Sequence, residues 1–305
     1  MAGWNAHDIP DQSGRTAVVT GANGGLGYVT ARELARKGAR VVLACRSEAR
    51  GKEAVERLAL EVPHAVVELA RLDLGDLASV REFAAARSDG RLDLLLNNAG
   101  VMAMPYGTTV DGFETQFGVN HLGPFALTNL LLPQITDRVV TVSSLLHRGG
   151  TIDFNDLNWR RRKYGRSTAY AQSKLANLLF GLELQRRLTA SGSSVRSVMA
   201  HPGYARTNLQ TRTGNAFEDF TWRIINRVIA HPPETGALPS LFAVAEDIPG
   251  GSFVGPDGRR ELGGNPTLAG RSRPASDVES ARRLWLASEE LTGARYPLAA
   301  TFERP

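Results

Sequence analysis

The chain has 305 residues, of which 42% are hydrophobic and 22% are charged, and this composition is typical of a globular protein with a sizeable core. Cys45 is the single cysteine, so an internal disulfide is excluded. No apolar run reaches the ~18 residues of a transmembrane helix. Residues 1–13 are polar and lack the hydrophobic centre of a signal peptide. We expect a soluble, cytoplasmic protein without a membrane anchor.

The net charge of +5 fits binding to nucleic acid, to an anionic membrane or to a phosphorylated cofactor, and it does not choose among them. The one basic cluster flanked by aromatic residues, Trp-Arg-Arg-Arg-Lys-Tyr at 159–164, fits RNA, a membrane or an acidic substrate. A solvated loop explains the same pattern more simply. We therefore predict no nucleic-acid partner.

Hydrophobic runs and their boundaries predict the elements in chain order. After a loose lead-in over residues 1–13, strands are expected at 16–19, 39–44, 65–69, 92–96, 138–143, 195–200 and 252–254. Helices are expected at 28–37, 47–60, 76–87, 112–132, 168–189, 211–230, 234–245 and 276–288. This alternation favours right-handed crossovers, and so an α/β fold with one Rossmann-type, doubly wound parallel sheet flanked by helices on both faces.

The first predicted strand leads into a glycine-rich turn, Thr-Gly-Ala-Asn-Gly-Gly-Leu-Gly at residues 20–27, and the turn leads into a helix. In this context a chain can bind the pyrophosphate of a dinucleotide. Residues without Cβ let the backbone come close, and the N–H groups of the helix N-terminus hold the negative charge. Because such glycines also serve tight packing, the turn alone is a weak indication of a nucleotide site.

Four further motifs follow the turn in order along the chain. They are Asn97-Asn98-Ala99-Gly100 after the fourth strand, Ser143-Ser144 after the fifth, Tyr170-Ala171-Gln172-Ser173-Lys174 in the long helix, and Pro202-Gly203 after the sixth strand. The ordered set resembles the short-chain dehydrogenase/reductase family over nearly all of the chain from Gly14. The resemblance implies a single NAD(P)-binding domain over residues 14–305, with substrate loops at about 145–167 and 204–231, and a homodimer or homotetramer.

Four stretches narrow the resemblance to the retinol dehydrogenase-like and WW-domain oxidoreductase-like branch of that family. They are Ala44-Cys45-Arg46, residues 119–125, residues 152–159 and His201-Pro202-Gly203. Membrane-bound members of the branch carry a hydrophobic N-terminal anchor. The sequence has no such segment, so we do not extend a membrane location to this chain.

Tyr170 and Lys174 stand four residues apart in a predicted helix, so their side chains share one face. A phenol with its usual pKa near 10 is a poor acid–base group at neutral pH, and a neighbouring ammonium lowers that pKa. The resemblance makes Tyr170 the proton donor or acceptor, and makes Lys174 its partner and a ligand of the nicotinamide ribose. It makes Ser144, the second serine of its pair, the residue that hydrogen-bonds the substrate oxygen. Asn120 would distort its helix and hold a water that connects Lys174 to solvent, or it would simply satisfy a buried backbone group.

The cofactor preference is decided at the end of the second strand, where a carboxylate binds the ribose of NAD and an Arg accepts the 2′-phosphate of NADP. Arg46 stands there, and no acidic residue precedes Glu48, so NADP(H) is preferred and NAD(H) is the weaker alternative. Asn23 is a counter-indication, since some NADP-preferring relatives carry a basic residue at that position. Asp73 is either an adenine contact or a turn residue. The full set of cofactor residues that the resemblance implies is Gly21, Asn23, Gly25, Leu26, Gly27, Arg46, Asp73, Leu74, Asn98, Ala99, Gly100, Tyr170, Lys174, Pro202, Gly203 and Thr207.

These residues together predict an NADP(H)-dependent oxidoreductase that interconverts a carbonyl and an alcohol, without a metal site. The substrate side is expected in the loops at 102–106, 145–148 and 204–223, and their apolar residues, such as Met102, Leu145 and Tyr204, favour a lipophilic small molecule. The alternative is a non-catalytic protein that senses NADP(H) and relays its redox state to a partner. A sensor needs the cofactor site and not the proton-transfer residues, so the complete set of Asn120, Ser144, Tyr170 and Lys174 argues against it.

Overall fold

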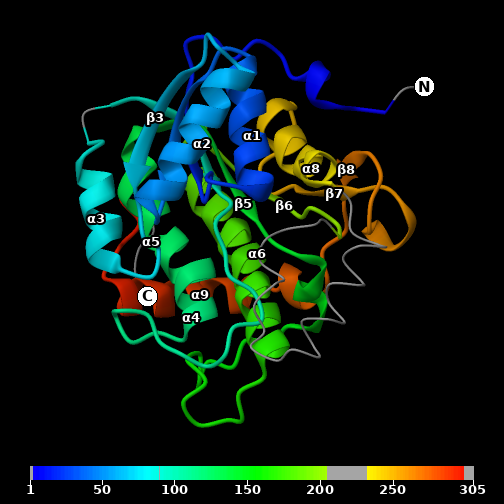
Figure 1. The fold of residues 1–305 in the computed structure, drawn as a ribbon. Coiled ribbons are helices and arrows are strands. Elements are labelled where there is room, and N and C mark those ends of the chain that lie inside the picture. Colours follow the sequence, from blue (N-terminus) through cyan, green and yellow to red (C-terminus); the bar gives the residue numbers. More distant parts are fainter. Residues whose placement is uncertain (1–2, 89, 205–231, 299–305) are drawn as a thin grey trace.

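The computed structural model describes residues 3–88, 90–204 and 232–298, and these residues are built around an eight-stranded sheet (Figure 1). The order across the sheet is β3-β2-β1-β4-β5-β6-β7-β8. The strands are β1 (Thr16–Thr20), β2 (Arg40–Cys45), β3 (Val66–Arg71), β4 (Leu92–Asn97), β5 (Ile135–Val142), β6 (Arg196–Ala200), β7 (Phe253–Pro256) and β8 (Pro266–Leu268). β1 to β7 run parallel, and β8 pairs antiparallel with β7. The predicted doubly wound α/β sheet is confirmed.

Helices cover both faces of the sheet (Figure 1). They are α1 (Gly25–Arg36), α2 (Glu48–Glu61), α3 (Leu77–Ala85), α4 (Thr115–Phe117), α5 (Gly123–Leu131), α6 (Arg166–Ala190), α8 (Pro233–Ala245) and α9 (Val278–Thr292). α1, α2 and α8 pack on one face, and α3, α5, α6 and α9 pack on the other. Successive side chains of a strand point to opposite faces, so Val18 belongs to one core and Val19 to the other.

The strand order reverses at β1, which lies between β2 and β4. At such a reversal the loops that follow the strands diverge and leave a crevice at the carboxyl ends. β1 ends at Thr20, where the glycine turn begins. β4 ends at Asn97, directly before Asn98. The topology therefore brings both motifs to one crevice.

The prediction of one continuous helix over 112–132 is wrong in two places. Residues up to Glu114 form a loop, and the Glu114 carboxylate caps α4 by accepting the backbone N–H groups of Gln116 and Phe117 at 2.9 and 2.7 Å. A π-helical turn, Gly118–Leu122, then separates α4 from α5. Asn120 lies in this turn, so the helix distortion predicted at Asn120 is present. An apolar pattern does not distinguish a π-turn from an α-turn, because the side chains on either side still face the core.

Residues 3–13 differ from the expected loose lead-in, because they pack onto the fold. Ile9 is buried, the ring of Trp4 meets that of Phe242 in α8 at 5.3 Å, and the Trp4 indole donates to the Glu246 carboxylate at 2.7 Å. Because the apolar residues of this polar segment are isolated, they form no helical or strand periodicity from which this packing could be predicted.

β8 has only three residues, two of them exposed, and no hydrophobic run predicted it. The predicted helix at 211–230 and the loop from residue 205 to 231 lie outside the described residues. Among the helices of the described ranges, none is both long and apolar enough to cross a bilayer.

Candidate active site

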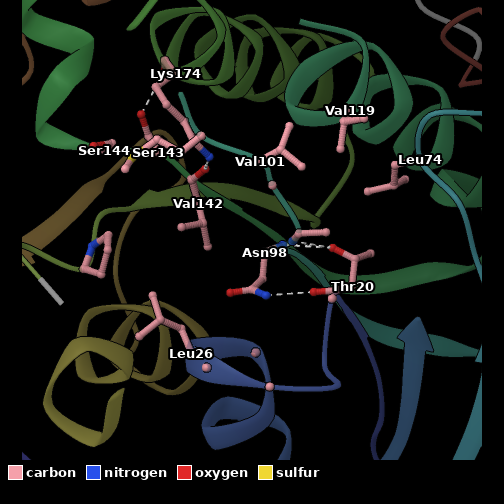
Figure 2. Close-up of a pocket in the computed structure, with 18 of the residues that line it drawn as sticks. Thr20, Leu26, Leu74, Asn98, Val101, Val119, Val142, Ser143, Ser144 and Lys174 are labelled. Atoms are coloured by element: carbon pink, nitrogen blue, oxygen red, sulfur yellow. Dashed lines mark hydrogen bonds between the residues drawn. The ribbon is translucent and has the colours of Figure 1, made fainter. Parts of the chain in front are cut away.

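A cavity of about 860 Å³ lies where β1, β2, β4 and β5 end, and Figure 2 shows its lining. This volume falls in the range of small-molecule and cofactor sites. The predicted site residues that line it are Gly21, Asn23, Gly25, Leu26, Gly27, Arg46, Asp73, Leu74, Asn98, Ala99, Gly100, Ser144, Tyr170, Lys174, Pro202 and Gly203. Asn120 lies behind Gly100 and does not line the cavity, and Thr207 lies outside the described residues.

The glycine turn forms a cradle at the first end of the cavity. Gly21 has a φ of +69°, and a Cβ on it would lie 3.0 Å from the Cα of Ala99. A Cβ on Gly27 would overlap the side-chain nitrogen of Asn98 and the backbone oxygen of Gly21. α1 starts at Gly25, and its N-cap, Gly24, gives the first turn no side-chain hydrogen bond. The cradle therefore keeps the space and the uncapped helix N-terminus that fit the pyrophosphate of a dinucleotide.

Thr20, which the sequence analysis missed, ties the glycine turn to the loop after β4 (Figure 2). Its hydroxyl accepts the backbone N–H groups of Asn98 and Ala99 at 3.0 Å each and donates to the Leu96 carbonyl at 3.2 Å. The Asn98 amide donates to the Thr20 carbonyl at 2.8 Å. The one available signal was a polar residue at the end of an apolar strand, where a buried hydroxyl needs partners.

Arg46 lines the cavity beyond the end of β2, and two further charged residues, Arg50 and Glu53 of α2, line it there. Within the described ranges, neither the Arg46 nor the Arg50 guanidinium has a hydrogen-bond or ion-pair partner. The carboxylates of Glu53 and Asp73 line the cavity as well, so Arg46 and Arg50 supply these unpaired guanidinium groups without making the whole end positive. Arg50 was missed, although its place in the first turn of α2, four residues after Arg46, was a usable signal.

Asp73 was predicted to be either an adenine contact or a turn residue, and its position is compatible with both. One oxygen of its carboxylate accepts the backbone N–H of Gly75 at 2.9 Å, as in a turn, and its own N–H donates to the Ser79 hydroxyl at 3.1 Å. Asp73 and the following Leu74 also line the cavity. The turn explains the residue without excluding a contact to a ligand.

Ser144 and Tyr170 meet at the second end of the cavity. The Ser144 hydroxyl, which follows β5, hydrogen-bonds the Tyr170 phenol of α6. The hydroxyl of the adjacent Ser143 donates instead to the backbone carbonyl of Lys174 at 2.8 Å (Figure 2). Of the two serines, Ser144 is therefore the one whose hydroxyl reaches the phenol.

Lys174 lies one turn after Tyr170 and is buried. Its Nζ donates to the Val142 carbonyl at 3.1 Å and is 5.7 Å from the centre of the Tyr170 ring. Burial lowers the pKa of Lys174 to about 8. Burial also raises the pKa of Tyr170 to about 12, against the opposing effect of the Ser144 hydrogen bond. The expected lowering of the phenol pKa is thus wrong for the polypeptide, because the lost hydration of a buried phenolate outweighs the Ser144 hydrogen bond.

Asn120 satisfies the backbone of a cavity-lining residue, Val101. Its side-chain oxygen accepts the Val101 N–H at 2.7 Å, and its amide donates to the Val101 carbonyl and the Ser173 hydroxyl at 2.9 Å each. A Cβ on Gly100 would lie 3.1 Å from the Asn120 oxygen and 3.5 Å from the Lys174 nitrogen. Asn120 therefore satisfies a buried backbone group, which was the second interpretation of this residue. Its role in holding a water that connects Lys174 to solvent stays a prediction.

The second end of the cavity opens between apolar walls. The apolar side chains there are Met102, Met104, Leu145, Leu146, Tyr204 and Leu262. The basic cluster at 159–164 is not part of this lining. It is folded on itself: the Asp156 carboxylate accepts three successive backbone N–H groups of the cluster, and the Arg162 guanidinium stacks on the Trp159 ring at 3.6 Å. Arg161 and Lys163 remain exposed, as in a solvated loop.

A doubly wound sheet with a glycine cradle at its reversal point is the arrangement of a dinucleotide-binding protein. The family model for short chain dehydrogenases matches residues 15–216, and the chain belongs to that family.

Three known proteins illustrate the similarity. Retinol dehydrogenase 13 of Homo sapiens is 46% identical over 294 residues, which is 93% of this chain and 86% of that protein. The crystal structure of an uncharacterised Mycobacterium paratuberculosis protein is 51% identical with a TM-score of 0.84, covering 97% of this chain and 100% of that one. A structure described as an NAD(P)-dependent gluconate 5-dehydrogenase of Beutenbergia cavernae, with NADP bound at low occupancy, is 26% identical with a TM-score of 0.58, covering 76% and 90%.

Proposed function

We propose that the protein is an NADP(H)-dependent oxidoreductase that interconverts a carbonyl and an alcohol on a lipophilic substrate, with Tyr170 as general acid and base. The observation that carries the proposal is the Ser144–Tyr170 pair, which faces an apolar mouth of the same cavity that has the glycine cradle. The retinol named for the human relative and the apolar walls both favour a lipophilic substrate. The NADP in the Beutenbergia structure is compatible with the cofactor proposal.

The cofactor would be held by the cradle from Gly21 to Gly27, by Asp73 and Leu74, and by the loop Asn98–Gly100. When bound, the nicotinamide supplies or accepts the hydride. At neutral pH the Tyr170 phenol is protonated, since its pKa is raised to about 12 by burial. In the reductive direction it donates this proton to the substrate oxygen, which the Ser144 hydroxyl holds by a hydrogen bond. Alcohol oxidation runs the same proton transfer backwards.

The test of this proposal is NADPH consumption against a panel of aldehydes, ketones and quinones. We expect turnover of an apolar member of the panel. Ser144→Ala should lower that turnover by about 10²-fold, because the substrate oxygen loses a preorganised hydrogen-bond donor. Ser143→Ala is the matched comparison and should lose much less, since its hydroxyl serves a backbone carbonyl. Equal losses in the two variants would remove Ser144 from its role. Tight NADPH binding without any turnover would favour the sensor alternative.

The NADP(H) preference rests on Arg46. Replacing it by aspartate exchanges a guanidinium that can pair with a 2′-phosphate for a carboxylate that repels it. We expect Arg46→Asp to lower the ratio of kcat/KM for NADPH to that for NADH by about 10²-fold, the size of a lost hydrogen bond between charged groups. Arg282→Asp, an equal charge change at an exposed position of α9, is the control. An unchanged ratio in Arg46→Asp would exclude Arg46 as the selecting residue.

A further inference from the structure

The wall of the cavity at Leu262 belongs to a strained loop between β7 and β8. Arg260 and Glu261 are successive non-glycine residues with a φ of +57° each. This left-handed conformation costs free energy at residues with a Cβ, and it persists only where surrounding contacts enforce it. Leu262, the next residue, lines the cavity, and its carbonyl accepts the Tyr204 N–H at 2.8 Å.

The Glu261 carboxylate contacts two residues outside this loop, Arg148 and His201. One oxygen accepts from the Arg148 guanidinium at 2.6 Å, and Arg148 belongs to the 3₁₀ turn Leu145–Gly149 that directly follows Ser144. The other oxygen lies 3.0 Å from Nε2 of His201, the residue before Pro202 and Gly203. Glu261 thus touches the segment after β5 and the segment after β6, which both line the reacting end of the cavity.

The contact with His201 is made by a neutral imidazole. Burial, followed by the charges of His147 and Arg148, lowers the pKa of His201 to about 3. Its Nδ1 accepts the Gly203 N–H at 3.2 Å, so the ring proton sits on Nε2 and faces the Glu261 carboxylate. Within the described residues neither His201 Nε2 nor this Glu261 oxygen makes a hydrogen bond, so the contact is a dipole beside a charge and not an ion pair.

Two glycines show that the segments beside the His201–Glu261 contact pack closely against it. A Cβ on Gly255 of β7 would overlap the His201 ring, and a Cβ on Gly203 would lie 2.5 Å from the Leu262 carbonyl. His147 connects the segment after β5 to the same group of side chains. Its Nδ1 donates to the Ser144 carbonyl at 2.7 Å, and its ring packs on Phe253, which also packs on His201.

We propose that Glu261 is a positioning residue that joins Arg148 and His201 and so fixes Leu262 and the Pro202–Tyr204 turn as one wall of the substrate end. This inference rests on the proposed function for its kinetic consequence. Because Arg148 is half exposed, the ion pair contributes little to global stability. Its loss should therefore affect how the substrate is held, and should leave the folded state and the distant cofactor cradle as they are.

The experiment compares the wild type with Glu261→Gln, Arg148→Gln, the double variant, and Glu290→Gln as the control at an exposed glutamate of α9. Hydrogen–deuterium exchange of the Gly203 and Tyr204 amides is measured first, because it needs no turnover. In Glu261→Gln we expect exchange there to become about tenfold faster, with an unchanged melting temperature. The KM of the best carbonyl substrate should rise about tenfold, and NADPH affinity should fall by less, because the glycine cradle still binds the cofactor although Pro202 and Gly203 are loosened. The double variant should resemble Glu261→Gln alone, since both changes break the same contact.

Unchanged exchange at Gly203 and Tyr204 would overturn the proposal, whatever the kinetics show. Faster exchange with an unchanged KM would also overturn it, since Glu261 would then be structural only. If the wild type reduces no carbonyl, the proposed function fails, while the exchange measurement still decides whether Glu261 holds the two segments together.

Discussion

Tyr170→Phe should lower turnover about 10³-fold and leave NADPH affinity nearly unchanged. The variant removes one hydroxyl, the group that transfers the proton and that hydrogen-bonds Ser144. The ring still fills its place in α6, and the glycine cradle at the far end of the cavity is untouched. Turnover is measured by NADPH consumption, and affinity by fluorescence titration of NADPH.

Tyr296→Phe is the matched control for this substitution. Its hydroxyl bonds Ser191 at 3.0 Å, and Tyr296 packs on Trp285, outside the cavity lining. The control should keep wild-type turnover. Activity retained in Tyr170→Phe would show that another group donates the proton. Loss of NADPH affinity together with turnover would place Tyr170 in cofactor binding and leave its acid–base role without support.

The fold could be predicted because the central parallel strands, such as Leu92–Asn97, are buried on both faces and are short, mainly apolar runs. β8 could not be predicted in this way, because it pairs at an edge through three residues and buries only Pro266. Ile9 illustrates a second limit. It is one of a few isolated apolar residues in a polar segment, and only the tertiary position of that segment buries it.

Most of the residues predicted for the candidate site line one cavity, whereas their protonation could not be predicted from the sequence. Motifs that end separate strands meet at one crevice because parallel strands end at the same edge of the sheet, which brings residues as distant as Gly21 and Tyr170 to one cavity. The direction of the Tyr170 pKa was predicted wrongly, since a spacing of four residues gives the neighbour but not the depth of burial. Contacts between loops, such as those of Thr20 and Glu261, depend on positions that no local pattern encodes.

Lys174→Met should have opposite effects on activity and on stability. Turnover should fall at least about 10²-fold, because the ammonium beside Tyr170 is lost. The free energy of unfolding should rise by about 1 to 3 kcal/mol near pH 7, since methionine fills a similar volume without burying a charge. The Val142 carbonyl keeps a donor, because the Asn177 amide also bonds it, at 3.1 Å. Urea unfolding and NADPH consumption measure the two effects, and Lys52→Met, at an exposed lysine of α2, is the control.

The pH dependence of this stability difference tests its cause. The pKa of Lys174 is about 8 in the folded chain, against an ordinary value of 10.5. Between these values the unfolded chain holds a proton that the folded chain has released, so the stability of the wild type rises with pH relative to the variant. A shift of this size corresponds to about 3 kcal/mol. The advantage of Lys174→Met should therefore be full below pH 8 and vanish towards pH 10.5. A variant that is less stable than the wild type, or more stable by the same amount at every pH, would show that the buried ammonium does not strain the fold.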